Sequence, residues 1–115
     1  MTISRIIDIL EARLLTKGAD CTREVHTACG SDMMSDVLAY VKDQAVLLTG
    51  LNNPQVVRTA DMMDMICIVF VRGKAPDEML LALAEESGIA VMATDKTMFT
   101  ACGLLYSEGL RGGVG

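Results

Sequence analysis

The stretch ICIVFVRGKAPDEMLLALAEESGIAVMAT, residues 66–94, decides the fold of this chain. It begins and ends with continuous apolar runs, residues 66–71 and 89–94, which are rich in Val and Ile and typical of strands buried on both faces of a sheet. Between these runs, Pro76 suits the start of a helix and Gly88 suits its end. The side chains expected to face inward from this helix, over about residues 77–87, are Met79, Leu80, Leu83 and Ala84. The stretch therefore predicts a strand, a crossover helix and a second strand.

The same alternation continues on both sides of this stretch. AVLLT at residues 45–49 predicts another buried strand, and Asn53 is expected to cap a helix that has Pro54 at its first position. A last helix is expected over about residues 97–107. Strands that alternate with helices predict an α/β fold with a mainly parallel sheet and helices on both faces.

Shorter elements are expected before residue 45. Apolar residues at helical spacing predict a helix over residues 3–10, and strand-like runs occupy residues 12–16 and 24–30. Ser31 or Asp32 is expected to cap a further helix. The inward side of that helix is expected to carry Met33 or Met34, Val37, Leu38 and Val41, and its outward side Asp36, Lys42 and Asp43. We expect one domain over residues 1–108 and a flexible tail over residues 109–115.

Composition excludes several classes of protein. The chain has 115 residues, is 51% hydrophobic, and carries a net charge of −5 with only 3% aromatic residues. Because single-stranded nucleic-acid binders combine a basic groove with aromatic stacking platforms, nucleic acid is not an expected partner. The longest apolar run is too short to span a bilayer, and the N-terminus lacks a signal pattern, so a cytoplasmic protein without a membrane partner is expected.

The cysteines and the single histidine do not form a recognisable motif. Cys21, Cys29, Cys67 and Cys102 include no CxxC pair, so free thiols in a reducing compartment are the first interpretation, and no metal or cofactor is expected. Cys29 and Cys102 lie near predicted helix starts, where a thiolate could be stabilised. His26 falls in a predicted strand without a nucleophile beside it. We therefore expect a protein that is not an enzyme.

Polar and glycine residues collect where the predicted parallel strands end. In open parallel sheets, ligands bind at this edge, between loops that lead into helices. Glycines allow close backbone approach, hydroxyl and amide groups donate hydrogen bonds, and cations attract a phosphate or another small anion. The candidate ligand-binding residues are Gly30, Ser31, Asp32, Thr49, Gly50, Asn52, Asn53, Arg72, Gly73, Thr94, Asp95 and Thr97.

Each of these residues also has a purely structural interpretation. Ser31, Asn53 and Thr94 are typical helix caps, glycines are typical of turns, and Arg72 and Lys96 can be solvated charges. Thr94 or Asp95 is expected to cap the last helix. Neither GxGxxG nor GxxxxGK[ST] occurs in the chain.

The order of these elements resembles the DRTGG domain over about residues 2–107. The most specific pieces are GSDMMSDVL at residues 30–38 and GIAVMATDKTMFTACGLL at residues 88–105. The domain occurs in CBS-domain inorganic pyrophosphatases and some phosphotransacetylases, and it is related to the N-terminal domain of HPr kinase. The letters DRTGG do not occur here, and Leu51, Asn52 and Asn53 stand where relatives often carry a charged pair.

The resemblance implies a non-catalytic, usually dimeric module that regulates enzymes. We therefore expect a homodimer that binds a small anionic ligand, such as a nucleotide or another phosphorylated molecule, and modulates a partner enzyme. The alternative is a docking or dimerisation subunit without a ligand, associated with an iron–sulfur or hydrogenase-type electron-transfer complex. A redox or metal module built from the cysteines is a third hypothesis.

Overall fold

A computed structural model describes residues 1–40 and 44–112. The predicted positions Val41, Lys42 and Asp43, and residues 113–115 of the predicted tail, lie outside the described residues. The helices are α1 (Ile3–Leu10), α2 (Met34–Tyr40), α3 (Pro54–Met62), α4 (Glu78–Glu86) and α5 (Met98–Ser107). The strands are β1 (Arg13–Leu14), β2 (Thr27–Gly30), β3 (Ala45–Thr49), β4 (Cys67–Phe70) and β5 (Ala90–Ala93). These bounds confirm the predicted order of elements.

The strands form one five-stranded sheet in the order β1-β5-β4-β3-β2. β2, β3, β4 and β5 are parallel to one another, in a register that aligns Leu48 with Val69 and Val69 with Met92. β1 runs antiparallel to β5 and adds the one antiparallel pair of the described sheet. The predicted α/β class with a mainly parallel sheet is confirmed.

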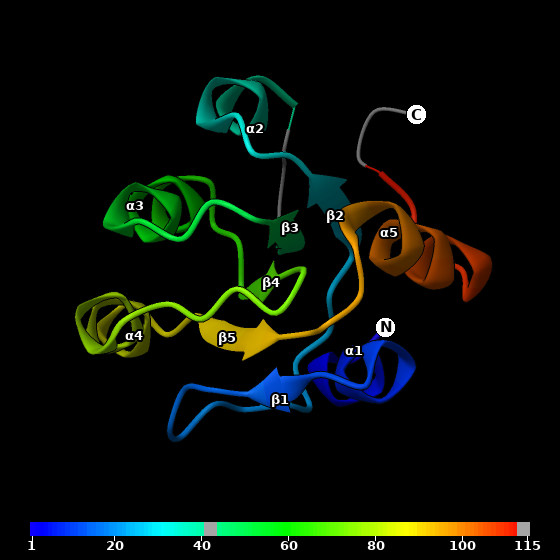
Figure 1. Ribbon diagram of the computed structural model, residues 1–115, viewed down its shortest axis with the longest axis horizontal. Coiled ribbons are helices and arrows are strands. Elements are labelled where there is room, and N and C mark those ends of the chain that lie inside the picture. Colours follow the sequence, from blue (N-terminus) through cyan, green and yellow to red (C-terminus); the bar gives the residue numbers. More distant parts are fainter. Residues whose placement is uncertain (41–43, 113–115) are drawn as a thin grey trace.

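Helices cover both faces of this sheet (Figure 1). α2, α3 and α4, which connect the successive parallel strands, lie on one face, and α1 and α5 lie on the other. The polypeptide therefore changes faces after β5. The segment between β5 and α5 crosses the sheet edge to bring α5 beside β2 and β3, whereas the segment after β2 leads to α2 on the opposite face.

Alternate residues of each central strand face the two layers. On β3, Val46 and Leu48 pack with α1 and α5, and Leu47 packs with the helices of the other face. All five residues of β3 and all four residues of both β4 and β5 are buried. Because burying one Val, Leu or Ile side chain contributes about 1.5–3 kcal/mol, these strands supply much of the hydrophobic stabilisation.

Four helices begin at an N-cap residue that accepts a backbone hydrogen bond: Thr2, Asn53, Asp77 and Thr97. The cap of α5 corrects the sequence prediction, which placed it at Thr94 or Asp95. Thr94 is buried, and its hydroxyl donates to the carbonyl of Leu10 at 2.7 Å. Since the chain must first cross the sheet edge, α5 begins further along, where Thr97 Oγ1 accepts from the backbone N–H of Thr100.

Two predicted inward-facing side chains, Met79 and Leu38, are exposed. Met79 precedes the buried Leu80 and is 72% exposed, because successive residues of a helix point about 100° apart. Leu38 is also exposed. Of the alternatives Met33 or Met34, Met34 packs against the core beside Val37, and Met33 is exposed. Because α2 is a short helix at one end of the layer, only one side of it meets the sheet.

The first residues of the predicted tail pack against the domain. Leu110 is buried, and the backbone N–H of Ala28 on β2 donates to the carbonyl of Arg111 at 3.0 Å. The guanidinium of Arg111 lies 3.9 Å from the centre of the Tyr106 ring. Residues 110 and 111 therefore cover part of the outer edge of β2.

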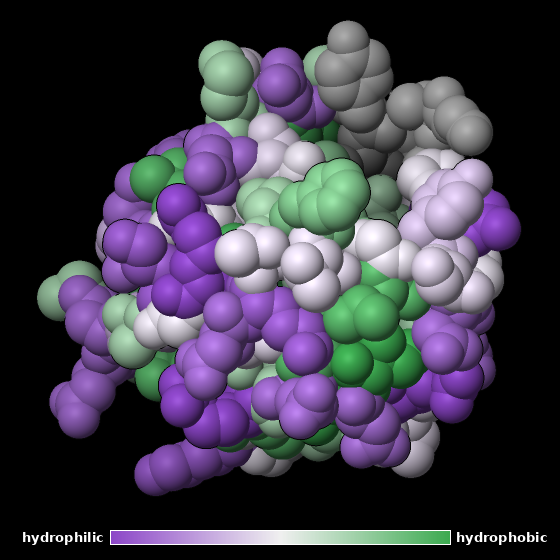
Figure 2. Space-filling view, turned by 45° about the vertical axis from the view of Figure 1, so that its right-hand side comes forward, coloured by the Kyte–Doolittle hydropathy of each residue, from purple (hydrophilic) through white to green (hydrophobic). Residues whose placement is uncertain are grey.

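Polar side chains dominate one face of the molecule (Figure 2). A compact group of apolar residues lies among them. Exposed large apolar side chains occur on several elements, and the most exposed is Phe99 at 88%. Among the described residues, none of the helices has the length and apolar character needed to cross a membrane.

Candidate ligand-binding site

The segments that follow β2, β4 and β5 enclose a pocket of about 420 Å³. It lies at the carboxyl edge of the parallel strands, where the segment after β2 leads to one face of the sheet and α5 begins on the other. Two segments that leave an edge toward opposite faces open a crevice between them, and ligands bind in such crevices in open α/β sheets. The lining residues are Gly30, Ser31, Asp32, Val71, Arg72, Thr97, Met98 and Phe99. Five of the predicted site residues are therefore brought together: Gly30, Ser31, Asp32, Arg72 and Thr97.

Asp32 is held in place by the end of β3. Its Oδ1 accepts from the backbone N–H of Gly50 at 2.7 Å and from the hydroxyl of Thr49 at 3.1 Å. Of the two predicted caps of α2, Ser31 or Asp32, Asp32 therefore does not take that role. Instead, the hydroxyl of Ser31 accepts from the backbone N–H of Met33 at 2.9 Å, just before that helix. Both hydrogen bonds that Asp32 accepts from the described residues use Oδ1, so Oδ2 has no hydrogen-bond donor among them.

Arg72 lies in a tight turn that aims its side chain across the sheet edge. Its φ of 59° is left-handed, and its backbone N–H donates to the carbonyl of Lys96 at 2.8 Å. The guanidinium lies directly over Gly50, where the methyl group of an alanine would overlap it. Within residues 1–40 and 44–112, the guanidinium makes no hydrogen bond or ion pair. An exposed cation is therefore available beside the pocket.

Gly30 allows α5 to approach the end of β2. A Cβ atom at this position would lie 2.8 Å from Cys102 Sγ and 3.2 Å from Met98 Sδ. Real Cβ contacts are longer than the first of these distances. The glycine is thus required by packing between the strand and the helix.

The other predicted residues support neighbouring turns outside the pocket lining. Asn53 caps α3 by accepting from the backbone N–H of Gln55 at 3.0 Å, and Asn52 donates to the carbonyl of Ala75 at 3.4 Å. Gly73, with a φ of 68°, lies beside the carboxylate of Asp95. Thr49 and Gly50 position Asp32, and Thr94 is buried under α1.

Sequence reasoning missed Val71, Met98 and Phe99 as lining residues. It assigned Met98 and Phe99 only to the last helix and gave their positions no role. The one signal in the sequence was their place directly after Thr97, which was a predicted site residue. Phe99 is almost fully exposed although one side of α5 packs on the core through Ala101 and Leu105.

The cysteines do not favour nucleophilic or metal chemistry. Burial raises the pKa of Cys29 and of Cys102, so neither position stabilises a thiolate as the sequence suggested. Cys29 lies in β2 and Cys102 in the middle of α5, away from helix starts. In the part of the chain that the structure describes, no three His, Cys, Asp or Glu side chains are grouped to hold a metal ion.

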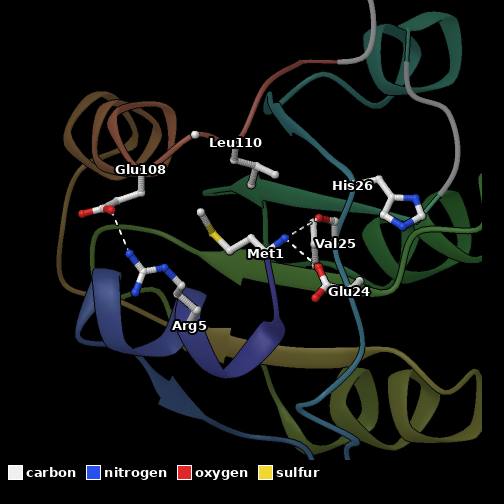
Figure 3. Close-up of a pocket in the computed structure, with 8 residues that line it drawn as sticks. Met1, Arg5, Glu24, Val25, His26, Glu108 and Leu110 are labelled. Atoms are coloured by element: carbon white, nitrogen blue, oxygen red, sulfur yellow. Dashed lines mark hydrogen bonds and ion pairs between the residues drawn. The ribbon is translucent and has the colours of Figure 1, made fainter.

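A second pocket of about 420 Å³ lies between α1, the segment that leads into β2 and the end of α5 (Figure 3). Its cations are paired: the amino group of Met1 donates to Glu24 at 2.8 Å, and Arg5 donates to Glu108 at 2.8 Å. His26, predicted to lie in a strand, stands just before β2 and also lines this pocket. Because its carboxylates already hold its cations, this pocket is less suited to an anion than the pocket beside Arg72.

The fold defines a small α/β domain with a mainly parallel sheet and a pocket at the carboxyl edge of its strands. The family model of the DRTGG domain matches residues 5–107, and the chain therefore belongs to the DRTGG domain family. This confirms the resemblance found in the sequence.

A solved structure shares this fold. It contains the CBS and DRTGG domains of the regulatory region of Clostridium perfringens pyrophosphatase, complexed with the activator diadenosine tetraphosphate. The TM-score is 0.76 at 18% sequence identity, and the match covers 90% of this chain and 45% of that chain. This chain thus corresponds to less than half of that structure. No curated protein matches the chain.

Proposed function

We propose that this DRTGG domain is a non-catalytic regulatory module of the cytoplasm. It binds a small anionic ligand, with nucleotides among the candidates, at the carboxyl edge of its sheet and modulates a partner enzyme. The pyrophosphatase region with the same fold is regulatory and was solved with a nucleotide activator, which supports a regulatory role for this family member.

The guanidinium of Arg72 carries the proposal. It is exposed, it has no partner among the described side chains, and it lies next to a pocket large enough for a small molecule. Arginine binds phosphate and carboxylate groups through parallel N–H donors, so an unpaired arginine at a pocket favours an anionic ligand. Asp32, held by Thr49 and Gly50, supplies a fixed acceptor in the same pocket.

The same pocket supports a binding role rather than catalysis. Its described lining contains the hydroxyls of Ser31 and Thr97 but no histidine or lysine to activate them. The hydroxyl of Ser31 already accepts from Met33 N–H, and that of Thr97 caps α5. These groups therefore act mainly in local structure.

Thermal unfolding in the presence of phosphorylated compounds tests the proposal. A panel would include inorganic phosphate, nucleotides, dinucleotides and sugar phosphates. A compound at 100 times its Kd stabilises the folded state by about 2.7 kcal/mol, and for a domain of this size about 1 kcal/mol raises the Tm by about 4 °C. We therefore expect a rise of roughly 10 °C at saturating ligand.

Two arginine variants make this experiment specific. Arg72→Gln removes the unpaired guanidinium and should abolish the ligand-dependent rise, whereas Arg58→Gln removes an exposed arginine of α3 outside the pocket lining and should preserve it. A rise that persists in Arg72→Gln would place the ligand elsewhere. A panel without any response would contradict the proposal and favour the docking alternative.

We also propose that the module acts as a homodimer, as the resemblance to the family implies. Light scattering on the purified chain at several concentrations tests this point. A mass of one chain at all concentrations, with and without ligand, would refute it.

A further inference from the structure

We propose that the pocket beside Arg72 is a nucleoside monophosphate site in which the base stacks on Phe99. This inference rests on the proposed function and adds the chemical class of the ligand. Arg72 would bind the phosphate, and Asp32 would accept a hydrogen bond from a hydroxyl or amino group of the ligand.

Phe99 is unusually placed for a residue without a ligand. It lies in the first turn of α5, a helix that buries Ala101 and Leu105, yet its own side chain is 88% exposed. A phenylalanine left in water forgoes about 1.5–3 kcal/mol of burial. In the described structure Phe99 lines the same pocket as Arg72 and Asp32. An aromatic face and a cation that share one pocket match the two ends of a nucleotide.

The charges of the pocket limit the number of phosphates. Among its described lining residues Arg72 is the cationic one and Asp32 is anionic, so their charges cancel. Lys74 and Lys96 also follow strands at this edge, but neither lines the pocket, and Lys96 pairs with Glu11 at 3.3 Å. A polyphosphate would bring several negative charges to one arginine and meet the carboxylate of Asp32. One phosphate group is the better match.

Stacking is the interaction that would separate a nucleotide from a simple sugar phosphate. Stacking of a base on an aromatic side chain contributes about 1–3 kcal/mol. Since about 1.4 kcal/mol corresponds to tenfold in Kd, a nucleoside monophosphate should bind about 5- to 150-fold more tightly than ribose 5-phosphate. Adenosine, which lacks the phosphate that Arg72 would bind, should also bind more weakly than AMP.

Calorimetric titration of the full chain tests this with the four nucleoside monophosphates, ribose 5-phosphate and adenosine. For the monophosphate that binds most tightly, Phe99→Leu should raise the Kd by about 5- to 150-fold while leaving the Kd of ribose 5-phosphate unchanged. Phe99→Trp should keep the affinity. Because the chain contains no Trp, this variant also reports stacking directly through quenching of its fluorescence.

The outcomes separate this inference from the proposed function. If ribose 5-phosphate binds as tightly as every monophosphate and Phe99→Leu changes neither, the anion site stands and the base site is refuted. If no phosphorylated compound binds, both fail. If Phe99→Leu instead changes the mass measured by light scattering without changing any Kd, Phe99 contacts a second copy of the chain and the base site is refuted.

Discussion

Replacement of Gly30 by alanine tests how α5 is seated against the sheet. The new Cβ would lie 2.8 Å from Cys102 Sγ and 3.2 Å from Met98 Sδ. Since non-bonded carbon atoms prefer separations of about 3.5–4.0 Å, the helix or the thiol must move by roughly 1 Å. Overpacking of this kind lowers the free energy of unfolding by about 1–3 kcal/mol. Alanine also reduces the conformational freedom of the unfolded chain, which raises the free energy of unfolding by about 0.4–1 kcal/mol. We expect Gly30→Ala to lower the free energy of unfolding by about 1–2 kcal/mol.

A double-mutant cycle with Cys102→Ala isolates this contact. Removing Sγ makes room for the methyl group that Gly30→Ala introduces, so the double variant should be more stable than the sum of the two single changes predicts. We expect a coupling of about 1 kcal/mol or more, measured by urea unfolding of the four proteins. Met98 Sδ stands at the end of a flexible side chain and can move aside.

Gly103→Ala provides the control for this cycle. Gly103 also lies in α5, but among the described residues no heavy atom beyond its own stretch of helix stands within 4 Å of the place that its new methyl group would take. Alanine should therefore stabilise the helix by about 0.5–1 kcal/mol. The reasoning is refuted if Gly30→Ala and Cys102→Ala are additive within about 0.5 kcal/mol, because independent sites behave in that way.

Three further changes test other parts of the domain. Thr59 is buried in α3 and its hydroxyl has no hydrogen-bond partner among the described residues. Thr59→Val should therefore raise the free energy of unfolding, measured by urea unfolding, by about 1 kcal/mol. A decrease in this free energy would show that the hydroxyl is hydrogen-bonded. Thr97→Ala removes the cap of α5 and should lower the Tm by about 4 °C, a loss of about 1 kcal/mol, whereas an unchanged Tm would contradict the capping role. Burial raises the pKa of Cys67. Above about pH 8.5 its thiol therefore ionises in the unfolded chain but stays protonated in the folded domain. Because only the unfolded state then loses this proton, the free energy of unfolding should fall by up to about 1.4 kcal/mol per pH unit. In Cys67→Ala, the free energy of unfolding should fall less steeply with pH between about pH 8.5 and 10 than in the unaltered protein. Equal slopes in the two proteins would refute the contribution of Cys67.

The buried strands were the most predictable part of the fold. A parallel strand covered on both faces must be apolar at every position, so β3, β4 and β5 appear in the sequence as uninterrupted apolar runs. Helix ends were also predictable where the cap is local, as with Asn53 before Pro54.

Helix faces were less predictable because apolar residues occur around most of each helix. Met79 and Leu38 are as apolar as the buried residues beside them, and only the position of the sheet decides which side is covered. Thr94 shows the same limit for caps. It has the chemistry of a cap, but its hydroxyl is taken by the carbonyl of Leu10, which is 84 residues away in the chain.

The α/β class, the parallel direction of the central strands and hence the edge at which their loops meet can all be predicted from the sequence, because they follow from local periodicity and turn residues. Which loop residues share a pocket became clear from the packing of the helices on the two faces of the sheet. α5 crosses to the face opposite α2, and this brings Phe99 and Thr97 beside Arg72 and Asp32. The physical reason is that local patterns specify the direction and burial of each element, whereas contacts between loops depend on which face of the sheet each following helix covers.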